Sequence, residues 1–225
     1  MEFFRLAGER STVRSYVIQT LSNEEKSNLL ALKEKLLFLP NARPVNWKLE
    51  EDAKALGRFF AYVHEDSIFS SIEYGFEGEQ LILHLVSLGY GTMWQAIGTQ
   101  EEVPAFLRFG QPKEENLKGK FFKTLVRGGL RRPFQTFIKG EEGLLDDRQR
   151  RIIEAMILSP SALNRQPWSF TILSNNALRI ELTDKKPLNF LDLGIVLAHG
   201  ALGYAETYGS YCLKKREMFV WELSY

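Results

Sequence analysis

Three short segments of the chain could contact a small ligand through their side chains or backbone. The first, Arg10-Ser-Thr-Val-Arg14, supplies two guanidinium groups and two hydroxyls. Arginine pairs with phosphate oxygens through two parallel hydrogen bonds, so this composition predicts a phosphate site. If a helix begins here, the two arginines lie four residues apart on one of its faces. The alternative interpretation is a surface turn with ordinary arginines.

The second segment, Pro160–Trp168, combines two prolines with two amide side chains. The prolines, at positions 160 and 167, predict an extended chain leaving a helix, with backbone groups near Ser161 turned toward a ligand. Asn164 and Gln166 each offer a donor and an acceptor, which suits a ring with alternating carbonyl and N–H groups. Trp168 is expected to anchor the next strand in the core. A plain turn at the end of a helix is the alternative.

The third segment is the turn Gly89-Tyr-Gly91, which ends a long apolar stretch. Glycine ends helices readily and lets the backbone approach a ligand closely. The turn lacks the third glycine of a dinucleotide fingerprint, and it follows a helix instead of a strand. The sequence therefore excludes a Rossmann site here.

The elements that must position these segments repeat along the chain. Pro40-Asn-Ala42 and Pro160-Ser-Ala162 are 160 − 40 = 120 residues apart. Glu73-Tyr-Gly75 and Asp192-Leu-Gly194 are 192 − 73 = 119 residues apart. This common offset predicts two related halves. The alternative is that any chain of helices and strands offers similar elements at recurring intervals.

Each half is expected to run as helix, proline-containing turn, strand and long buried helix. The first helix of each half has apolar residues at helical spacing behind an acid-rich start. The signals are Leu29, Leu32 and Leu36 after Ser22-Asn-Glu-Glu25, and Ile152, Ile153, Met156 and Ile157 after Asp146-Asp147. Strands are expected over Phe59–Val63 and Arg179–Thr183, and the long helices are expected to end near Gly89 and Gly209.

The overall composition is typical of a soluble globular protein. The 225 residues are 44% hydrophobic, and 29 basic against 28 acidic residues give a net charge of +1, which favours neither a nucleic-acid nor a membrane partner. The single Cys212 excludes an internal disulfide and a cysteine metal cluster. No signal peptide and no run of 18 apolar residues is evident, so we expect a cytoplasmic protein. His64, His84 and His199 show no metal-ligand spacing, and the last two are expected to be satisfied core histidines.

A basic segment separates the two halves. Residues 116–140 contain no Asp or Glu, and Gly128-Gly129 and Pro133 argue against one continuous helix. The cations are Lys118, Lys120, Lys123, Arg127, Arg131, Arg132 and Lys139. Such a run is a solvated connector, a source of cations for one phosphate, or a surface for RNA or anionic lipid.

Together these segments resemble the nitroreductase family of flavin-dependent oxidoreductases, and in particular its single-chain TM nitroreductase subgroup. The resemblance spans most of the chain. The specific motif is Pro160-Ser-Ala-Leu-Asn-Arg-Gln-Pro-Trp168. The supporting motifs are Arg10-Ser-Thr-Val-Arg14, Leu88-Gly-Tyr-Gly-Thr-Met-Trp94, Phe109-Gly-Gln-Pro112, Arg131-Arg-Pro133 and Asp192-Leu-Gly-Ile195.

The resemblance implies an α+β nitroreductase-like fold, with a central, mainly antiparallel sheet flanked by helices. Family members are typically homodimers that bind flavin between subunits. A single domain over residues 1–225, with pseudo-repeat halves at about 1–115 and 141–225 and the connector 116–140, would be a fused dimer. Because Pro40-Asn-Ala-Arg-Pro44 lacks the Ser, Asn and Gln of its counterpart, we expect one complete site per chain. The chain could then act as a monomer.

The resemblance also implies a role for each site residue. Arg10, Thr12 and Arg14 would hold the phosphate and ribityl chain of FMN, with Arg131 or Arg132 closing over the phosphate. Pro160, Ser161 and Asn164 would meet the cofactor from the other side, and the backbone near Gln95 and Ala96 would face the N5 edge of the ring. The full predicted set is Arg10, Ser11, Thr12, Arg14, Gln95, Ala96, Arg131, Arg132, Pro160, Ser161, Ala162, Asn164 and Gln166.

Two departures from the family pattern concern this set. Ser11 stands where the family usually has Arg or His, and Gln95-Ala96-Ile97 replaces a smaller segment. The implied function is FMN-dependent oxidation of NAD(P)H with ping-pong reduction of a nitroaromatic, a quinone or a related small acceptor. The chemistry belongs to the flavin, so it requires no catalytic acid or base. The alternative, which the departures motivate, is a degenerate flavin-fold protein that binds a ligand or partner without turnover.

Overall fold

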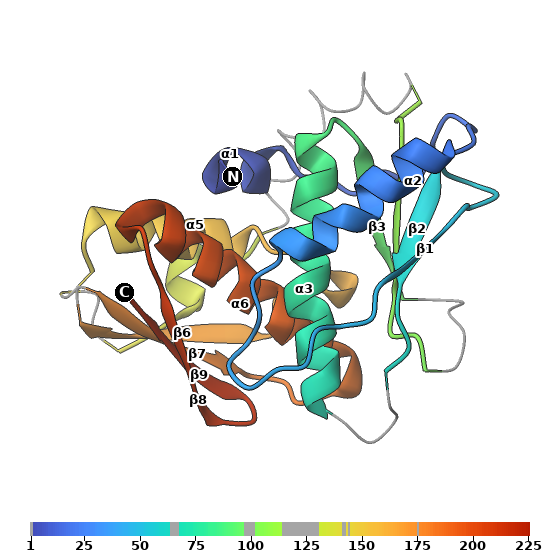
Figure 1. Cartoon of the computed structure of the whole chain (residues 1–225). Coiled ribbons are helices and arrows are strands. Elements are labelled where there is room, and N and C mark those ends of the chain that lie inside the picture. The colour runs from blue at the N-terminus through green and yellow to red at the C-terminus, as the bar shows by residue number, and fades with distance from the viewer. Residues whose placement is uncertain are drawn as a thin grey trace.

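The strands that the structure describes form two sheets, the first from residues 48–110 and the second from residues 138–224, so the second sheet includes a short strand from the predicted connector (Figure 1). The computed structural model describes residues 2–63, 68–96, 102–113, 131–140, 143, 145–174 and 176–225. The first sheet has the order β1-β2-β4-β3, with β1 Lys48–Glu50, β2 Gly57–Phe60, β3 Gly91–Gln95 and β4 Phe106–Gly110. The second has the order β5-β6-β7-β9-β8, with β5 Ile138–Lys139, β6 Trp168–Ser174, β7 Ala177–Leu182, β8 Cys212–Glu217 and β9 Val220–Ser224.

The predicted α+β class and the mainly antiparallel pairing are confirmed. The β5–β6 pair is parallel, and the other strand pairs are antiparallel. The strands do not form one central sheet, because two long helices, α3 (Ile68–Ser87) and α6 (Pro187–Tyr208), pack on each other in the middle of the molecule. The first sheet contacts α3, and the second contacts α6.

The shorter helices begin where the sequence predicted. Ser22 caps α2 (Asn23–Leu30) in a capping box with Glu25, and the apolar spacing continues into the 3-10 turn η1 (Ala31–Lys35). In the second half, the carboxylate of Asp146 accepts the Gln149 N–H at 2.7 Å and caps α5 (Asp147–Ile157). Two further elements are α1 (Phe3–Glu9) and the 3-10 turn η2 (Phe134–Thr136).

The two long helices cross at a pair of repeat-related glycines. A Cβ added to Gly194 would lie 1.9 Å from the carbonyl oxygen of Ile72, and one added to Gly75 would lie 2.1 Å from that of Leu191. Only residues without a side chain allow the two backbones to approach this closely. The two glycines are 194 − 75 = 119 residues apart, so the halves meet at equivalent positions.

One hydrogen bond occurs twice at the same offset. In the first half, Glu73 Oε1 accepts the Arg43 N–H at 3.3 Å. In the second half, Asp192 Oδ1 accepts the Ala162 N–H at 3.0 Å. The acceptors are 192 − 73 = 119 residues apart, and the donors are 162 − 43 = 119 residues apart. Each long helix thus holds the turn before its sheet by the same bond, which confirms the pseudo-repeat.

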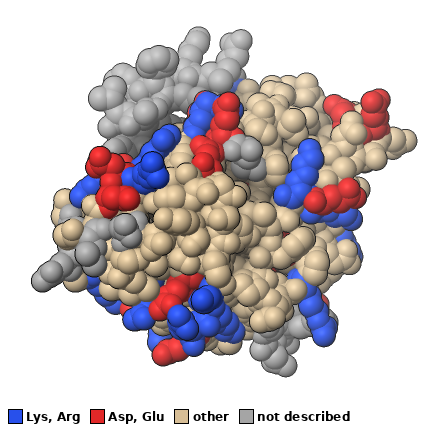
Figure 2. All heavy atoms as spheres, turned by 60° about the vertical axis from the view of Figure 1, so that its left-hand side comes forward, with Lys and Arg blue, Asp and Glu red and all other residues tan. Residues whose placement is uncertain are grey.

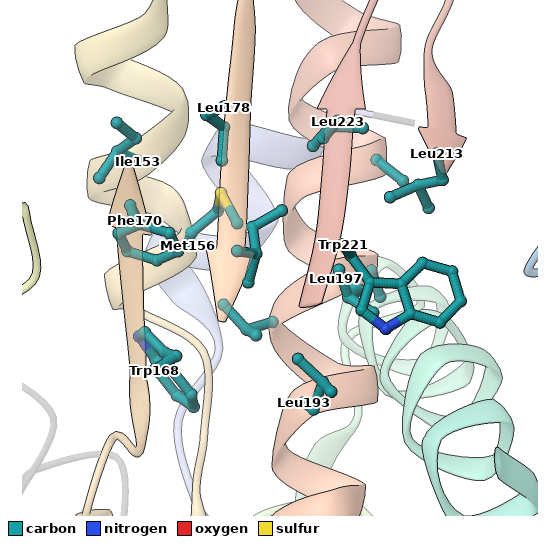
Figure 3. Close-up of a cluster of buried hydrophobic side chains, with 14 of the residues drawn as sticks. Ile153, Met156, Trp168, Phe170, Leu178, Leu193, Leu197, Leu213, Trp221 and Leu223 are labelled. Atoms are coloured by element: carbon teal, nitrogen blue, oxygen red, sulfur yellow. The ribbon is translucent and has the colours of Figure 1, made fainter. Parts of the chain in front are cut away.

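The core of the second half lies between the second sheet and helices α5 and α6 (Figure 3). Trp168 and Trp221 are at most 1% exposed, and Met156 of α5 packs in the same cluster, beside Phe170 and Leu178 in Figure 3. Trp168 is therefore a core anchor, as predicted. Helix α6 is long and apolar enough to span a membrane, but 72% of its apolar window is buried, as in the core helix of a soluble protein.

Candidate functional site

The arginine segment is extended and lies along the first sheet. Helix α1 ends at Glu9, Thr12 forms a parallel bridge with Thr92 of β3, and the Val13 N–H donates to the Thr92 carbonyl at 2.9 Å. No helix begins at Arg10, because the backbone of this segment pairs with β3, so the two arginines do not share a helix face. A Cβ on Gly91 would lie 2.7 Å from Val13 Cγ2, so this glycine lets the segment approach β3.

The two arginines of this segment have different surroundings. Arg14 is exposed. The Arg10 side chain is 6% exposed, and its Nε lies 3.8 Å from Oε1 of Glu79, a fully buried residue of α3. Glu79 was missed by the sequence analysis. Its signal was a carboxylate inside the apolar stretch of α3, 199 − 79 = 120 residues before His199.

The Pro160–Trp168 segment is not extended after its first residues. It forms the 3-10 turn η4 (Ala162–Asn164), and Leu163, Asn164 and Gln166 have φ of 53°, 55° and 51°. Residues other than glycine rarely take this left-handed conformation, and each such residue costs about 1–3 kcal/mol unless the surroundings impose it. The expectation of an extended chain is therefore wrong here, because bonds to other elements override the preference set by the prolines.

Those hydrogen bonds join the turn to α6, to α5 and to Arg132, and one of them lies within the loop itself. Asp192 of α6 accepts the Ala162 N–H, and Ser161 Oγ accepts the Gln166 N–H at 2.9 Å. The Gln166 side chain is fully buried; its Nε2 donates to Ile157 O at 3.0 Å, and its Oε1 accepts the Arg132 N–H at 3.2 Å. Gln166 thus braces the loop, with its amide directed at backbone groups.

Arg131 and Arg132 also brace this loop. Arg131 donates to the carbonyls of Ser159 and Leu158, both at 2.8 Å. Arg132 Nη1 donates to Gln166 O at 3.3 Å, and its guanidinium lies 4.9 Å from the Phe137 ring centre. Both guanidinium groups are therefore engaged with the loop in this structure. Lys118, Lys120, Lys123 and Arg127, which share the basic connector, lie outside the described residues.

The loop presents a small set of groups to solvent. Leu163 is 76% exposed, and Asn164 and Arg165 are also exposed. Pro160, Ser161 and Ala162 are half-buried. In the first half, Ser11 and Thr12 are half-buried beside β3, and so are Gln95 and Ala96 at its end. Ile97 lies outside the described residues.

The loop and β3 attach to the two central helices near their crossing. Ala162 is held by Asp192, which follows Leu191, the residue whose carbonyl abuts Gly75. Trp94 of β3 donates to Glu79, four residues further along α3. Asp192 is two residues from Gly194, and Glu79 is four residues from Gly75. The loop and β3 are therefore each bonded to a central helix within four residues of its crossing glycine.

Burial perturbs the carboxylates that hold the two loops. Burial raises the pKa of Asp192 to about 7, against the lowering effect of the Ala162 N–H and Arg165. Burial also raises the pKa of Glu77 to about 7, although this residue accepts bonds from the Val45 N–H and the Trp47 indole. Both carboxyl groups stabilise the fold, because their oxygens accept hydrogen bonds from backbone or indole N–H groups.

Of the two histidines expected in the core, His199 is confirmed as a satisfied core residue, His84 is half-buried, and His64 lies outside the described residues. His199 is fully buried and uses both ring nitrogens, one with Ala155 O at 2.8 Å and one with Glu79 Oε1 at 3.0 Å. Burial lowers the pKa of His84 to about 4. Among the described residues, no group of three or more His, Cys, Asp or Glu could hold a metal ion.

Charged side chains of both signs are interspersed on the face shown in Figure 2. On the outside of the second sheet, Glu222 pairs with Arg179 at 2.8 Å and with Arg216. These three residues help to line an open hollow of about 560 Å³. A second hollow of about 300 Å³ is lined by Lys33, Phe38, Pro44, Val45, Asn46 and Glu77. Neither hollow contains a residue of the predicted site.

Comparison with known proteins identifies relatives of the chain. A family model described as "Putative TM nitroreductase" matches residues 2–204. The chain is similar to the solved structure of a "putative nitroreductase" from Thermotoga maritima, with 29% identity, a TM-score of 0.81, and coverage of 100% of this chain and 94% of that one. No curated protein matches.

Two further solved structures resemble parts of the chain more weakly. One is a "putative NADH dehydrogenase/NAD(P)H nitroreductase" from Bacteroides thetaiotaomicron, with 15% identity, a TM-score of 0.41, and coverage of 50% of this chain and 87% of that one. The other is a nitroreductase family protein from Clostridium novyi, with 14% identity, a TM-score of 0.41, and coverage of 52% and 88%.

Proposed function

The chain belongs to the "Putative TM nitroreductase" family, and from that premise we propose that it is an FMN-dependent oxidoreductase. In this proposal NAD(P)H is the electron donor, and a nitroaromatic, a quinone or a related small molecule is the acceptor. The fold and the family are those of oxidoreductases, which supports the reaction class. The choice of FMN, NAD(P)H and the acceptor is a further step, which the experiments below test.

The donor set around the crossing of α3 and α6 fits a flavin phosphate. Arg10 and Arg14 supply cations, and Ser11 and Thr12 supply hydroxyls from an extended segment fixed against β3. Such a set matches the oxygens of a phosphate dianion. From the other half, Ser161 and Asn164 offer hydroxyl and amide groups on a loop held in a strained conformation. Strained backbone of this kind clusters at ligand sites.

The observation that carries the proposal is the attachment of both segments to the two helices that cross at Gly75 and Gly194. β3, which holds the arginine segment, is bonded to Glu79 of α3, and the Pro160–Trp168 loop is bonded to Asp192 of α6. Groups from the two halves can thus meet one ligand, as two subunits do in a dimeric relative. Bound FMN would supply the hydride and electron transfer chemistry.

The proposal assigns three kinds of role to the predicted residues. Arg10, Ser11, Thr12 and Arg14 bind the phosphate end, while Pro160, Ser161, Ala162 and Asn164 contact the ring and ribityl chain. The backbone of Gln95 and Ala96 borders the N5 edge of the ring. Arg131, Arg132 and Gln166 keep the loop in shape through the bonds described above. No side chain is required to move a proton.

One chain is proposed to hold one site and to act as a cytoplasmic monomer. The first-half loop Pro40–Pro44 lacks the Ser, Asn and Gln of its counterpart, so it offers fewer polar groups to a second flavin. The proposed partners are the small-molecule acceptor and the nicotinamide donor, with no nucleic acid and no membrane. The near-neutral net charge of +1 supports this choice.

A second candidate is a flavin-fold protein that binds its ligand without turnover. Two observations favour it. Arg131 and Arg132 donate to carbonyls of the loop, which reduces the number of cations offered to a phosphate. Ser11 also stands where the family usually has a basic residue. Steady oxidation of NAD(P)H in the presence of menadione or a nitroaromatic supports the enzyme. Flavin binding without such oxidation supports the second candidate.

The direct test of the first candidate is a flavin spectrum. We expect the purified protein to show one, or to gain it when FMN is added, and to lose it in the double variant Arg14→Ala, Asn164→Ala. Both side chains are exposed, so the variant should stay folded. Arg179→Ala, on the outer face of the second sheet, is the matched control and should keep its flavin. A colourless protein that takes up no FMN contradicts the proposal.

A further inference from the structure

A buried ionic cluster joins the two halves of the chain beside the arginine segment. Glu79 in α3 and His199 in α6 both have side chains with 0% exposure, and His199 Nε2 lies 3.0 Å from Glu79 Oε1. The two residues are 199 − 79 = 120 apart, so they occupy repeat-related positions with different side chains. A carboxyl group and an imidazole thus meet where the two halves pack together.

The hydrogen bonds of His199 determine where its protons lie. Nδ1 is 2.8 Å from the carbonyl oxygen of Ala155, which can only accept, so Nδ1 carries a hydrogen and donates it. Nε2 faces a carboxyl oxygen of Glu79, and this contact needs one hydrogen between the two atoms. That hydrogen lies on Nε2, giving imidazolium and carboxylate, or on Oε1, giving imidazole and carboxylic acid. In both arrangements the pair carries no net charge.

Glu79 connects this pair to the proposed flavin site. Its Oε2 accepts the indole N–H of Trp94 in β3 at 2.7 Å, and its Oε1 lies 3.8 Å from Arg10 Nε. Phe3 closes the cluster from α1, with its ring edge-on to the imidazole at 5.3 Å. One carboxyl group therefore touches both β3 and the first arginine of the phosphate segment.

We propose that Glu79 and His199 share this proton and act as a positioning pair, which holds the Arg10 guanidinium in register with the phosphate of FMN. The inference rests on the proposed function above. The contact with Glu79 is made by Nε, so the pair fixes one edge of the guanidinium group, and the planar fork can pair with phosphate oxygens through its Nη atoms. Anchoring a long side chain before the ligand arrives reduces the ordering cost of binding.

Glu79→Gln tests this role without changing the charge of the cluster. The glutamine amide has the same shape and still accepts the Trp94 N–H. The amide N–H can donate to Nε2 of a neutral His199, so the pair again carries no net charge and only the carboxyl group beside Arg10 is lost. Riboflavin lacks the phosphate and therefore serves as the internal reference. We expect the affinity for FMN to fall about tenfold or more, with the affinity for riboflavin nearly unchanged.

Two further variants separate positioning from a general loss of structure. Glu77→Gln alters another buried carboxyl group of α3, whose partners are Val45 and Trp47, and it should keep the preference for FMN over riboflavin. In an Arg10→Ala background, Glu79→Gln should weaken FMN binding no further, because the pair acts through Arg10. Equal losses for FMN and riboflavin, or additive losses in the double variant, overturn the positioning role.

The outcomes distinguish this inference from the function on which it rests. A wild-type protein that binds neither flavin overturns both. A wild-type protein that prefers FMN, with an unchanged preference in Glu79→Gln, overturns only the positioning pair. The shared proton has its own readout, because nitrogen NMR of labelled histidine can resolve the three imidazoles. We expect the His199 signals, assigned with His199→Gln, to show a protonated Nδ1, and a bare Nδ1 contradicts the proton arrangement.

Discussion

The glycine at the centre of the helix crossing should be the least replaceable residue of the fold. In Gly194→Ala, the new Cβ would lie 1.9 Å from the carbonyl oxygen of Ile72 and 2.7 Å from the Phe76 nitrogen, both backbone atoms. An ordinary carbon–oxygen contact is about 3.3 Å, so α3 and α6 must separate by roughly 1.4 Å at this point. Neither backbone can yield by a simple rotamer change.

The expected cost can be estimated from two opposing effects. Alanine is a better helix former than glycine by about 1 kcal/mol, which favours the variant. Overpacking typically costs about 1–3 kcal/mol, and more where backbone must move, as here. We therefore expect a net loss of about 2 kcal/mol or more in the free energy of unfolding, a large part of the stability of a typical domain. Asp192, two residues away, should shift with the helix and loosen the Pro160–Trp168 loop.

The assay is urea unfolding followed by tryptophan fluorescence and circular dichroism. Gly8→Ala in α1 is the control, because a Cβ there meets nothing within 4 Å, and it should be neutral or stabilising by up to about 1 kcal/mol. FMN affinity, measured on protein that remains folded, should fall in Gly194→Ala and stay constant in Gly8→Ala. A Gly194→Ala protein as stable as the wild type refutes the close backbone crossing.

Three further outcomes are expected. Burial raises the folded-state pKa of Glu77 from 4.5 to about 7, so between these pH values the folded form holds a proton that the unfolded form releases. The contribution of Glu77 to stability should therefore fall as pH rises from about 4.5 to 7. In urea unfolding measured across that range, Glu77→Gln should remove this part of the pH dependence. Ser22→Ala should lower stability by about 1 kcal/mol through loss of the capping box, and Ser87→Ala, whose hydroxyl bonds an exposed carbonyl, should change thermal stability less. Gln166→Leu should cost about 1–3 kcal/mol by leaving the Ile157 carbonyl without the amide donor, and hydrogen exchange near the loop should quicken; unchanged exchange contradicts the bracing role.

Features with local signals could be predicted from the sequence. The caps at Ser22 and Asp146 depend on residues at most three positions away, and both were found where predicted. The left-handed Gly209, with φ of 80°, ends α6 as expected. The pseudo-repeat could be read because each half keeps the same order of elements, and the two crossing glycines confirm it.

Features set by distant residues could not be predicted. Arg10–Arg14 is extended because its backbone pairs with Thr92, 92 − 12 = 80 residues from Thr12. The loop around Leu163 takes left-handed conformations because Asp192 holds it from another helix. The proposed role of Glu79 depends on its contacts with His199 and Arg10, which come from different parts of the chain. Tertiary pairing overrides local preference at each of these places.

Titration of the purified protein with FMN tests whether donor groups from the two fused halves build one flavin site. Isothermal titration calorimetry gives the stoichiometry, and flavin fluorescence checks the affinity. The expected result is one FMN bound per chain, with binding lost in the Arg14→Ala, Asn164→Ala variant. Two FMN per chain, or none at all, contradicts the account.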